Sequence, residues 1–542
     1  MAQAPPWLYA LPMSLSLSNH LRALALFASL SSISYAGQDP SVSDTSIDAL
    51  VEDVWAAAAT PDDPESALEL SLEAALSIGV ANDLGLQGAA EYSEAARFRE
   101  LGSWGAFDWI FSASARLEDS RLDPSTDFEV GTGVVDIDTN RRELSIGFQR
   151  AFRAGGDLSV GLEHNNSSTN SLFARNGNRD VLSAAYTRPL LRGAGRMYAT
   201  SLQQIAGLRS GREIESIRLQ RQQLLLDIEV KYWDLVLAQR QLEVAGSALD
   251  LAVEQLQRDR RRREAGVSTD VEVIQDEATV ARRIEGVLLV ETALETSMDR
   301  LRSTIFPGVE EGAWSVQIRP ITATPEISPA PADTEWDDEI RSALTLRSEV
   351  KLAEFDVKIA TALHARTVSE KQSSLDLLFQ VGSQGFDEGV GTSLEEALSY
   401  DSPTVAAGLS YQLPMKNTAL ANEERAARAE VRGARLGLDA VRSQIANEVR
   451  DALRQVRYQS EASRAANKTR EAAERLVTAE MSRYEQGLAT TFQVLEFQQA
   501  LVEAQYSERA VLTAYCQALA GLEAARGQIG GDGRRSSGEN AP

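Results

Sequence analysis

One twelve-residue segment of this chain occurs twice, and this duplication constrains the fold more than any other feature of the sequence. The two copies span residues 262–273 and 483–494, and they lie 221 residues apart. An arginine, a glycine, a threonine and a valine keep their places in both copies. Each copy interrupts a long stretch of helical character, so each is expected at the tip of a helical hairpin.

The residues of the repeated segment are those that end one helix and begin the next. Gly266 and Gly487 suit the left-handed backbone conformation with which helices commonly terminate. Three residues later, Thr269 and Thr490 can each begin a capping box, in which the residue three positions further on caps in return. The residues that complete the two boxes are Glu272 and Gln493. The chain is therefore predicted to be a tandem repeat of helical hairpins.

The arms of these hairpins are predicted to be very long. Residues 190–306 and 415–541 contain no proline, which destabilises a helix interior by roughly 3 kcal/mol. Large residues recur along the first arm at seven-residue spacing, and mostly small residues lie four positions before each of them. The large residues are Ile228, Leu235, Leu242, Leu249 and Leu256. This seam is typical of closely packed long helices, and a helix over residues 199–263 would be roughly 100 Å long.

A helix is expected at the start of each repeat, over about residues 68–99 and 334–371. Segments with strand character follow this helix and precede each hairpin. Apolar and polar residues alternate over residues 107–117, 144–149, 158–162 and 182–186 of the first half, and over 375–381 and 405–413 of the second. Alternation with period two gives a strand one apolar and one polar face. Strands that cross an outer membrane have this pattern, and so do half-buried strands of soluble proteins. The alternation alone leaves both open.

The order of these segments divides the chain into six parts. They are a secretory signal peptide at 1–36, an acidic linker at 37–67, a first repeat at 68–305, a proline-rich linker at 306–334, a second repeat at 335–528 and a disordered tail at 529–542. Arg22, the apolar run 23–28 and the small residues Ser34 and Ala36 indicate the signal. The first repeat carries about 43 extra residues before its hairpin. These residues either add a strand pair or lengthen the loops.

Composition argues against several functional classes. The formal net charge of −25 lacks the basic footprint of a nucleic-acid-binding protein. The single cysteine, Cys516, excludes an intrachain disulfide and a cysteine-based metal site, and the three histidines have no ligand spacing. The sequence has no glycine-rich nucleotide loop and no metalloprotease motif. We therefore expect no enzymatic activity, no cofactor and no metal.

Taken together, these features resemble the outer-membrane efflux (TolC-like) family over about residues 68–528. The resemblance rests on the duplicated tips, on residues 232–235 of the first arm, on the strand-to-helix junctions 187–193 and 411–414, and on residues 346–350. It implies a mainly α fold with membrane β structure, in which a tandem repeat of strand pairs and long helical hairpins assembles as a homotrimer. Each protomer would give four strands to a twelve-stranded outer-membrane barrel, which a periplasmic α-helical barrel continues.

The resemblance also implies a function and its partners. The protein would be a passive exit duct of an efflux or type I secretion system, in contact with outer-membrane lipid. An inner-membrane transporter would supply the energy, and a periplasmic adaptor would dock at the hairpin tips. The tip residues are Arg262, Gly266, Thr269, Arg483, Gly487 and Thr490.

The same resemblance assigns residues to an aperture at the tips. It places an acidic ring at Gln493 and Glu496, and it pairs Tyr484 with the acid Glu272 on the other hairpin. The amide at position 493 departs from the family acid, and Ala489 stands where the family has an arginine. Each residue also has a purely structural explanation, because capping, a solvated helix face or interhelical packing would suffice.

Two other functions are compatible with long helical hairpins. A periplasmic adaptor normally has one hairpin between small β-domains, whereas this sequence has two. A structural coiled-coil protein would not explain strand segments and prolines that repeat in register. The exit duct is therefore the preferred interpretation, and the sequence leaves its cargo open.

Overall fold

The computed structural model describes residues 47–51, 68–123, 130–132, 135–171, 174–308, 314, 316–327 and 336–530. The chain divides into two compact units, Met1–Thr60 and Pro61–Pro542. The described residues of the first unit, 47–51, are helical, and all elements named below belong to the second unit. The expected signal peptide, most of the expected acidic linker and residues 531–542 of the tail lie outside the described residues.

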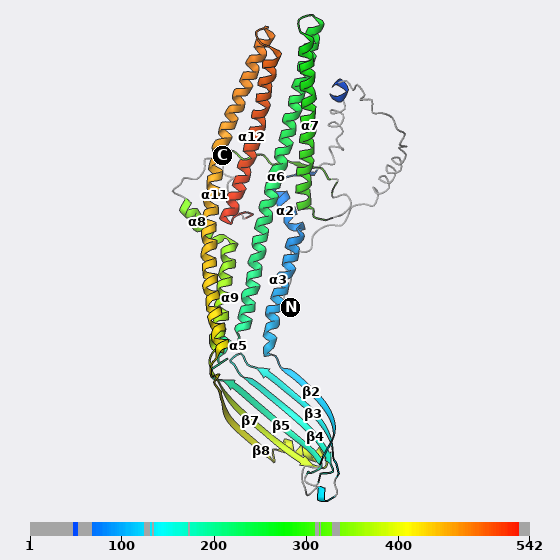
Figure 1. The fold of residues 1–542 in the computed structure, drawn as a ribbon, viewed down its shortest axis with the longest axis vertical. Coiled ribbons are helices and arrows are strands. Elements are labelled where there is room, and N and C mark those ends of the chain that lie inside the picture. The colour runs from blue at the N-terminus through cyan, green and yellow to red at the C-terminus, as the bar shows by residue number, and fades with distance from the viewer. Residues whose placement is uncertain are drawn as a thin grey trace, which may run out of the picture. The chain divides into compact units, whose positions relative to one another are not determined.

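The first repeat consists of a short strand, two helices, four long strands and a helical hairpin, with two single-turn helices at the ends of the sheet strands (Figure 1). In chain order its elements are β1 (Leu68–Leu70), α2 (Leu72–Asn82), α3 (Leu84–Ser103), η3 (Trp104–Phe107), β2 (Ile110–Leu122), β3 (Ile137–Ala151), β4 (Asp157–Thr169), β5 (Gly177–Pro189), α5 (Arg196–Ala199), α6 (Ser201–Glu264) and α7 (Asp270–Ile305). Helix α6 has 64 residues, which confirms the predicted long arm.

The second repeat follows the same plan with fewer strands. A short strand β6 (Ile318–Pro320) precedes α8 (Trp336–Leu346), α9 (Ser348–Glu370), β7 (Ser374–Asp387), α10 (Val390–Ser399), β8 (Pro403–Gln412), α11 (Thr418–Glu485) and α12 (Thr491–Arg526). The sequence predicted one helix where α8 and α9 stand. The helix is interrupted because Arg347 has extended backbone, and its side chain forms ion pairs with Glu349 and Glu448.

The start of the first repeat differs from the expectation. Residues 68–70 were expected to be helical, and they instead form β1, which pairs in parallel with β6 of the interrepeat linker. Tyr232, on α6, stabilises this pairing because its hydroxyl donates to the Leu70 carbonyl at 3.0 Å and accepts from the Thr322 amide at 3.0 Å. The aromatic residue that contributed to the family resemblance is therefore a structural anchor.

The six long strands form one antiparallel sheet with the order β2-β3-β4-β5-β7-β8. Strand β5, the last of the first repeat, pairs with β7, the first of the second repeat. Four strands per protomer were expected from the resemblance, and that number is wrong for this chain. The extra residues of the first repeat add the hairpin β3–β4 inside the sheet instead of lengthening a loop.

The strand register gives the sheet one apolar face and one face of small and polar residues, because residues directly opposite each other share a face. One apolar row crosses all six strands through Phe111, Phe148, Val160, Ala184, Val381 and Val405. The next row, on the other face, consists of Ser112, Gly147, Gly161, Ser183, Gly382 and Thr404. The predicted alternation is thereby confirmed.

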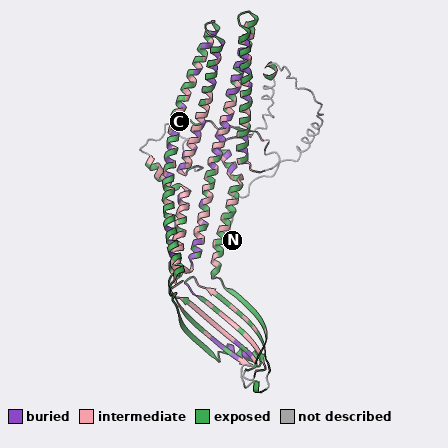
Figure 2. Ribbon diagram, in the orientation of Figure 1, coloured by how far each residue is buried: buried purple, intermediate pink, exposed green. Residues whose placement is uncertain are grey.

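Helix α10 packs across β5 and β7 at the end of the sheet that is remote from the long helices (Figure 1). Asp180 of β5 is buried there, where it accepts from Ser393 of α10 and lies 2.8 Å from Nδ1 of His164. Gly385 of β7 allows this packing, because a Cβ at that position would clash with the Ser393 carbonyl. Figure 2 shows the buried residues of the sheet gathered beside this helix, while most of the sheet is half-exposed or exposed.

Candidate functional site

The two hairpin tips have the same backbone geometry. At the first tip, Gly266 has φ +73°, and the amide of Val267 donates to the Arg262 carbonyl at 2.8 Å. At the second tip, Gly487 has φ +74°, and the amide of Leu488 donates to the Arg483 carbonyl at 2.8 Å. In each case the glycine takes the left-handed conformation and the following amide satisfies a helix-end carbonyl. The predicted helix ends are confirmed.

The returning helices α7 and α12 both begin with the predicted capping box. Thr269 caps α7, and its own amide donates to Glu272 at 2.8 Å. Thr490 caps α12, and its amide donates to Gln493 at 3.0 Å. Ser268 also donates to Glu272, and these hydrogen bonds hold the pKa of the Glu272 carboxyl below its usual range. Glu272 and Gln493 therefore act locally, each in closing its own hairpin.

The two hairpins are joined near their tips by Tyr484 and Asp259. The Tyr484 hydroxyl, on α11, donates to Asp259 of α6 at 2.5 Å. Gln255 donates to the other carboxylate oxygen of Asp259 at 2.9 Å, and Thr491 lies within 3.5 Å of it. Burial and the bond to Asp259 raise the pKa of Tyr484 to about 12, so its phenol stays protonated.

The expected partner of Tyr484 was Glu272, and the structure instead gives Asp259. Glu272 is occupied by Ser268 and Thr269 at the start of α7, whereas Asp259 is buried at the interface where Tyr484 enters. Arg262 completes the contact, since its guanidinium lies 4.6 Å from the centre of the Tyr484 ring. A hydrogen bond therefore links the two hairpins as expected, but its acid is Asp259 of α6 and not Glu272 of α7.

A second buried carboxyl, Asp276 of α7, faces Asp259. Asp276 is 1% exposed, and neither of its carboxylate oxygens has a donor among the described residues. Burial, followed by the neighbouring Asp259, raises the pKa of Asp276 to about 8. Two ionised carboxylates cannot share such a site, and a protonated Asp276 can donate to Asp259. The contact between the tips therefore contains a titratable carboxyl pair.

Glu496 lies apart from this cluster. Its side chain is exposed on α12 and lines an open groove against α7, together with Arg282 and Arg283. The structure thus brings Tyr484 to the first hairpin, but it does not bring Glu496 or Gln493 into the same contact. Within one protomer Glu496 is available to solvent and to other copies.

The tips also expose apolar side chains at equivalent positions of the two repeats. Val267 and Leu488 follow the two glycines and are 68% and 65% exposed. Val271 and Phe492 occupy the first turns of the returning helices and are 63% and 64% exposed. These exposed apolar side chains at equivalent positions are candidates for contact with another protein. They lie inside the duplicated segment, so their shared positions could have identified them from the sequence.

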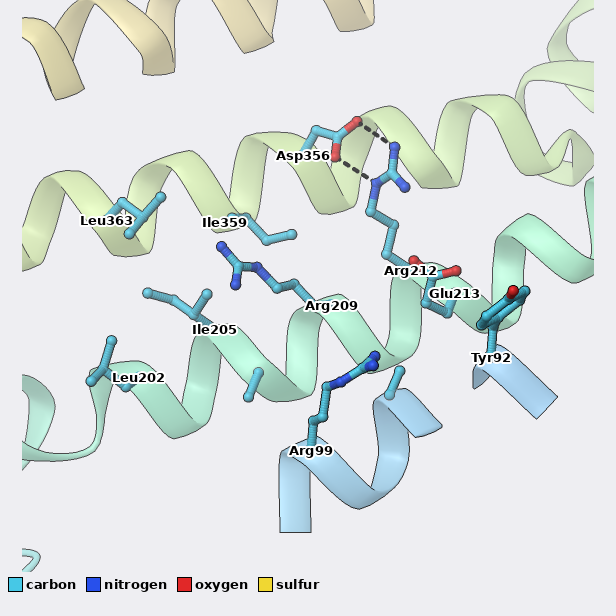
Figure 3. A pocket seen from close by; sticks show the side chains of 12 residues that line it. Tyr92, Arg99, Leu202, Ile205, Arg209, Arg212, Glu213, Asp356, Ile359 and Leu363 are labelled. Atoms are coloured by element: carbon cyan, nitrogen blue, oxygen red, sulfur yellow. Dashed lines mark hydrogen bonds and ion pairs between the residues drawn. The ribbon is translucent and has the colours of Figure 1, made fainter. Parts of the chain in front are cut away.

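A further groove, of about 790 Å³, lies between α3, α6 and α9 (Figure 3). Arg212 of α6 bonds Asp356 of α9 through two nitrogens, at 2.7 and 3.4 Å, and so joins the two repeats. Arg209 extends into the space between α6 and α9, beside Ile205 and Ile359, and Arg99 points from α3 toward α6 (Figure 3). This groove could not be predicted from the sequence, because its walls come from three distant segments.

Neither a metal centre nor a membrane-crossing helix is seen in the described part of the chain. No three His, Cys, Asp or Glu side chains there are grouped so that they could hold a metal ion. The described helices also lack the combination of length and apolar character that a bilayer crossing requires.

Comparison with known proteins relates both the sequence and the fold to outer-membrane channels. Residues 340–528 match the sequence profile of the family described as outer membrane efflux protein. A search of curated protein sequences finds no significant match. Among solved structures, VceC from Vibrio cholerae has a similar fold, with a TM-score of 0.62 and 14% identity over 84% of this chain and 96% of that one.

Two further channels have comparable similarity. CmeC of Campylobacter jejuni has a TM-score of 0.63 and 13% identity, over 84% of this chain and 85% of its own. The open state of MtrE from Neisseria gonorrhoeae has a TM-score of 0.55 and 16% identity, over 84% of this chain and 88% of its own. At this level of identity, the likeness establishes the fold.

Proposed function

We propose that this chain, whose residues 340–528 match the outer membrane efflux protein family, is the outer-membrane duct of an efflux or type I secretion assembly. The sheet lines the passage through the outer membrane, and the helical hairpins extend the passage into the periplasm. Conduction through the duct is passive, and an inner-membrane transporter supplies the energy.

The observation that carries this proposal is the apolar face of the sheet, which is exposed between the long helices and α10, the helix that covers only its far end over β5 and β7. Large apolar side chains stand on it in every strand, and Phe111 on one edge and Val405 on the other are 59% and 67% exposed. A soluble protein rarely leaves such a surface in water. Strands of an outer-membrane barrel have this pattern, with apolar residues toward lipid and polar residues toward the lumen.

A band of aromatic side chains indicates which end of the sheet lies at the periplasmic side of the membrane. Trp109, Phe111, Phe148, Tyr186 and Phe379 lie at the end of the sheet from which the long helices continue. Phe111 and Phe148 are in contact, with ring centres 5.2 Å apart. Aromatic girdles mark the interfaces of membrane barrels. This end of the sheet is therefore at the periplasmic interface, and the end with α10 is extracellular.

The proposed partners are two further copies of the chain and a periplasmic adaptor. Three copies would surround the passage, and their long helices would form its periplasmic wall. The exposed pairs Val267/Leu488 and Val271/Phe492 offer an apolar docking surface for a periplasmic adaptor. Arg262 and Arg483 flank this surface, so the adaptor would contact both equivalent tips in the same way.

The contact between Tyr484 and Asp259 would hold the tips of one protomer together when the aperture is closed. Glu496, which is exposed on the returning helix, would face the passage and meet its equivalents from the other copies. Gln493 is an uncharged amide that is held in its capping box. Glu496 would therefore carry the negative charge of the ring that three copies form at the aperture. The formal net charge of −25 would favour cations along the passage.

Membrane topology tests the proposal in intact cells. Cys516 is 2% exposed, so a cysteine introduced elsewhere can be labelled against a low background. Ser402→Cys lies between α10 and β8, and Val267→Cys lies at the first tip. A membrane-impermeant maleimide should label Ser402→Cys on intact cells, and it should label Val267→Cys only after the outer membrane is permeabilised.

The unmodified protein, with its buried Cys516, is the control for both variants and should remain unlabelled. Labelling of Val267→Cys in intact cells would place the tips outside the cell and contradict the proposal. The same conclusion would follow if Ser402→Cys reacted only after permeabilisation, because the sheet would then not reach the cell surface.

A further inference from the structure

The sheet has two unpaired edges. Strand β2 pairs only with β3, and strand β8 pairs only with β7, among the strands that the structure describes. Every residue of β8 is exposed. Backbone amide and carbonyl groups left unpaired in lipid are too costly for a membrane strand, so barrels close and leave no edge. Both edges therefore require a partner strand.

The additional hairpin β3–β4 has the same membrane-facing character as the other strands. Ile146 of β3 stands opposite Ala113 of β2 and Leu162 of β4, and Leu162 stands opposite Leu182 of β5. The apolar face is therefore continuous from β2 to β5 at one height. With 15 and 13 residues, β3 and β4 exceed the 9–11 residues that a tilted transmembrane strand needs.

The connections of the added hairpin also fit a membrane barrel. The turn between β3 and β4 spans residues 152–156 and lies at the helical end of the sheet. It is closed by the Phe152 amide, which donates to the Gly156 carbonyl at 2.8 Å. The connections from β2 to β3 and from β4 to β5 are longer and lie at the other end. Short periplasmic turns and longer extracellular loops are typical of outer-membrane barrels.

We infer that β8 of one copy pairs with β2 of the next, so that three copies close an eighteen-stranded barrel. The inference rests on the proposed trimeric duct. An even number of antiparallel strands makes β8 run opposite to β2, so each junction continues the antiparallel pattern. The apolar face continues as well, from Val405 and Leu409 on β8 to Phe111 and Ala115 on β2.

The added strands widen the passage. Barrel diameter grows roughly linearly with strand number, so eighteen strands give about 36 Å between backbones, against about 24 Å for twelve, at ~4.8 Å spacing and ~40° tilt. At the height of the inner row that begins with Ser112, the side chains leave this width open, because the row consists of glycine, serine and threonine. The duct therefore fits cargo wider than a twelve-stranded barrel admits, such as bulky solutes or polypeptide.

Cysteine cross-linking between edge strands tests the closure. Ala407→Cys on β8 is combined in one chain with Ala113→Cys or Ala115→Cys on β2, and in a second series with Val160→Cys or Leu162→Cys on β4. All five positions lie on the apolar face. Oxidation in the native outer membrane is followed by thiol blocking, denaturation and electrophoresis, and native mass is measured in parallel.

If the barrel has eighteen strands, the chains with cysteines on β8 and β2 should form covalent dimers and trimers. The chains with cysteines on β8 and β4 should form neither. Cross-links between β8 and β4 would overturn the inference, because β2 and β3 would then lie outside a twelve-stranded barrel. A trimer without either cross-link would also overturn it, while leaving the duct intact. A monomeric native mass would overturn the proposed duct itself.

A matched pair of arginine substitutions tests the membrane position of β3 without cysteines. Ile146 points to the apolar face, and its neighbour Ser145 points to the polar face beside Ser114. Ile146→Arg should lower the amount of protein in the outer membrane at least tenfold, and Ser145→Arg should leave it near the unmodified level. Equal insertion of the two variants would place β3 outside lipid and overturn the inference.

Discussion

The hydroxyl of Tyr484 donates a 2.5 Å hydrogen bond to Asp259, and this bond joins the two hairpins of one chain near their tips. The residues are 225 positions apart, and both are buried. Hydrogen bonds to charged groups contribute about 1.5–3 kcal/mol to stability. The bond is therefore strong enough to influence whether the tips stay together.

Replacing Tyr484 with phenylalanine should loosen the tips while retaining the ring over which Arg262 lies. Loss of about 1.5–3 kcal/mol corresponds to roughly a tenfold to hundredfold shift toward the separated state. Amide hydrogen exchange at residues 259–276 and 480–494 should accelerate by this factor. Tyr458→Phe, an exposed change on the same helix, is the control, and equal exchange in the two variants would contradict the role of the hydroxyl.

The tip contact should weaken as the pH rises from about 4 to about 8. Because the pKa of Asp276 is raised to about 8 by burial and by Asp259, the folded protein holds a proton that the unfolded chain releases. That stabilising contribution is complete below the ordinary carboxyl pKa of about 4, and it is lost as the pH passes about 8. Unfolding and tip exchange measured from pH 5 to pH 9 should show this slope.

Substitutions of the groups around Asp276 can show which of them causes the pH dependence. They are Asp259 and Arg258 on α6, Glu272 on α7, and Tyr484 on α11, which lies against Asp259. Asp276→Asn imitates the protonated form and should flatten the profile. Glu272→Gln should keep the slope, because the pKa of Glu272 is lowered and lies below this window. A slope that persists in Asp276→Asn would refute the assignment.

Replacing the glycine of either tip should destabilise the tip, because the glycine has a left-handed backbone conformation. Gly487 has φ +74°, and a Cβ there would meet nothing within 4 Å. Gly487→Ala should therefore destabilise the tip by about 1–2 kcal/mol through the left-handed conformation alone. Gly246, inside α6, also has free space around it, and Gly246→Ala should stabilise the helix by about 0.5–1 kcal/mol. Denaturant unfolding in detergent measures the free energy of unfolding of both variants. A change in the same direction for both would contradict this explanation.

Two arginines that form ion pairs should differ in their contribution to stability. Arg347 is 11% exposed and binds both Glu349 and Glu448, whose side chains are 27% and 38% exposed, so Arg347→Met should destabilise the protein by about 1–3 kcal/mol by leaving two half-buried carboxylates without their donor. Arg212 is 38% exposed beside Asp356, and Arg212→Met should cost about 0.2–1 kcal/mol. Thermal unfolding measures both, and a larger effect at Arg212 would reverse the assignment of buried and surface pairs.

Much of the local structure could be predicted from the sequence, because short-range chemistry determines it. The duplicated glycines and capping boxes predict both tips, and the period-two alternation predicts the strands. The order of the six strands could not be predicted, because it depends on backbone pairing between segments as distant as Asn178 and Asp387. Whether 43 extra residues become loop or sheet is decided by that pairing.

The partner of Tyr484 was assigned wrongly for a related reason. The family pattern pointed to Glu272, whose own capping box already uses its carboxylate. A signal for Asp259 was present, since it lies seven residues after Ala252 and so continues the seam of small residues along α6. An acid in a helix–helix seam needs a buried donor, but the sequence alone does not identify Tyr484 as that donor.

Single-channel recording shows whether this protein conducts solutes through a membrane. Mature protein in planar bilayers, with insertion verified, should produce discrete conductance steps that favour cations. The steps should grow in Tyr484→Phe, and their cation preference should fall in Glu496→Gln. If both the mature protein and Tyr484→Phe insert without any conductance, the protein is not a duct.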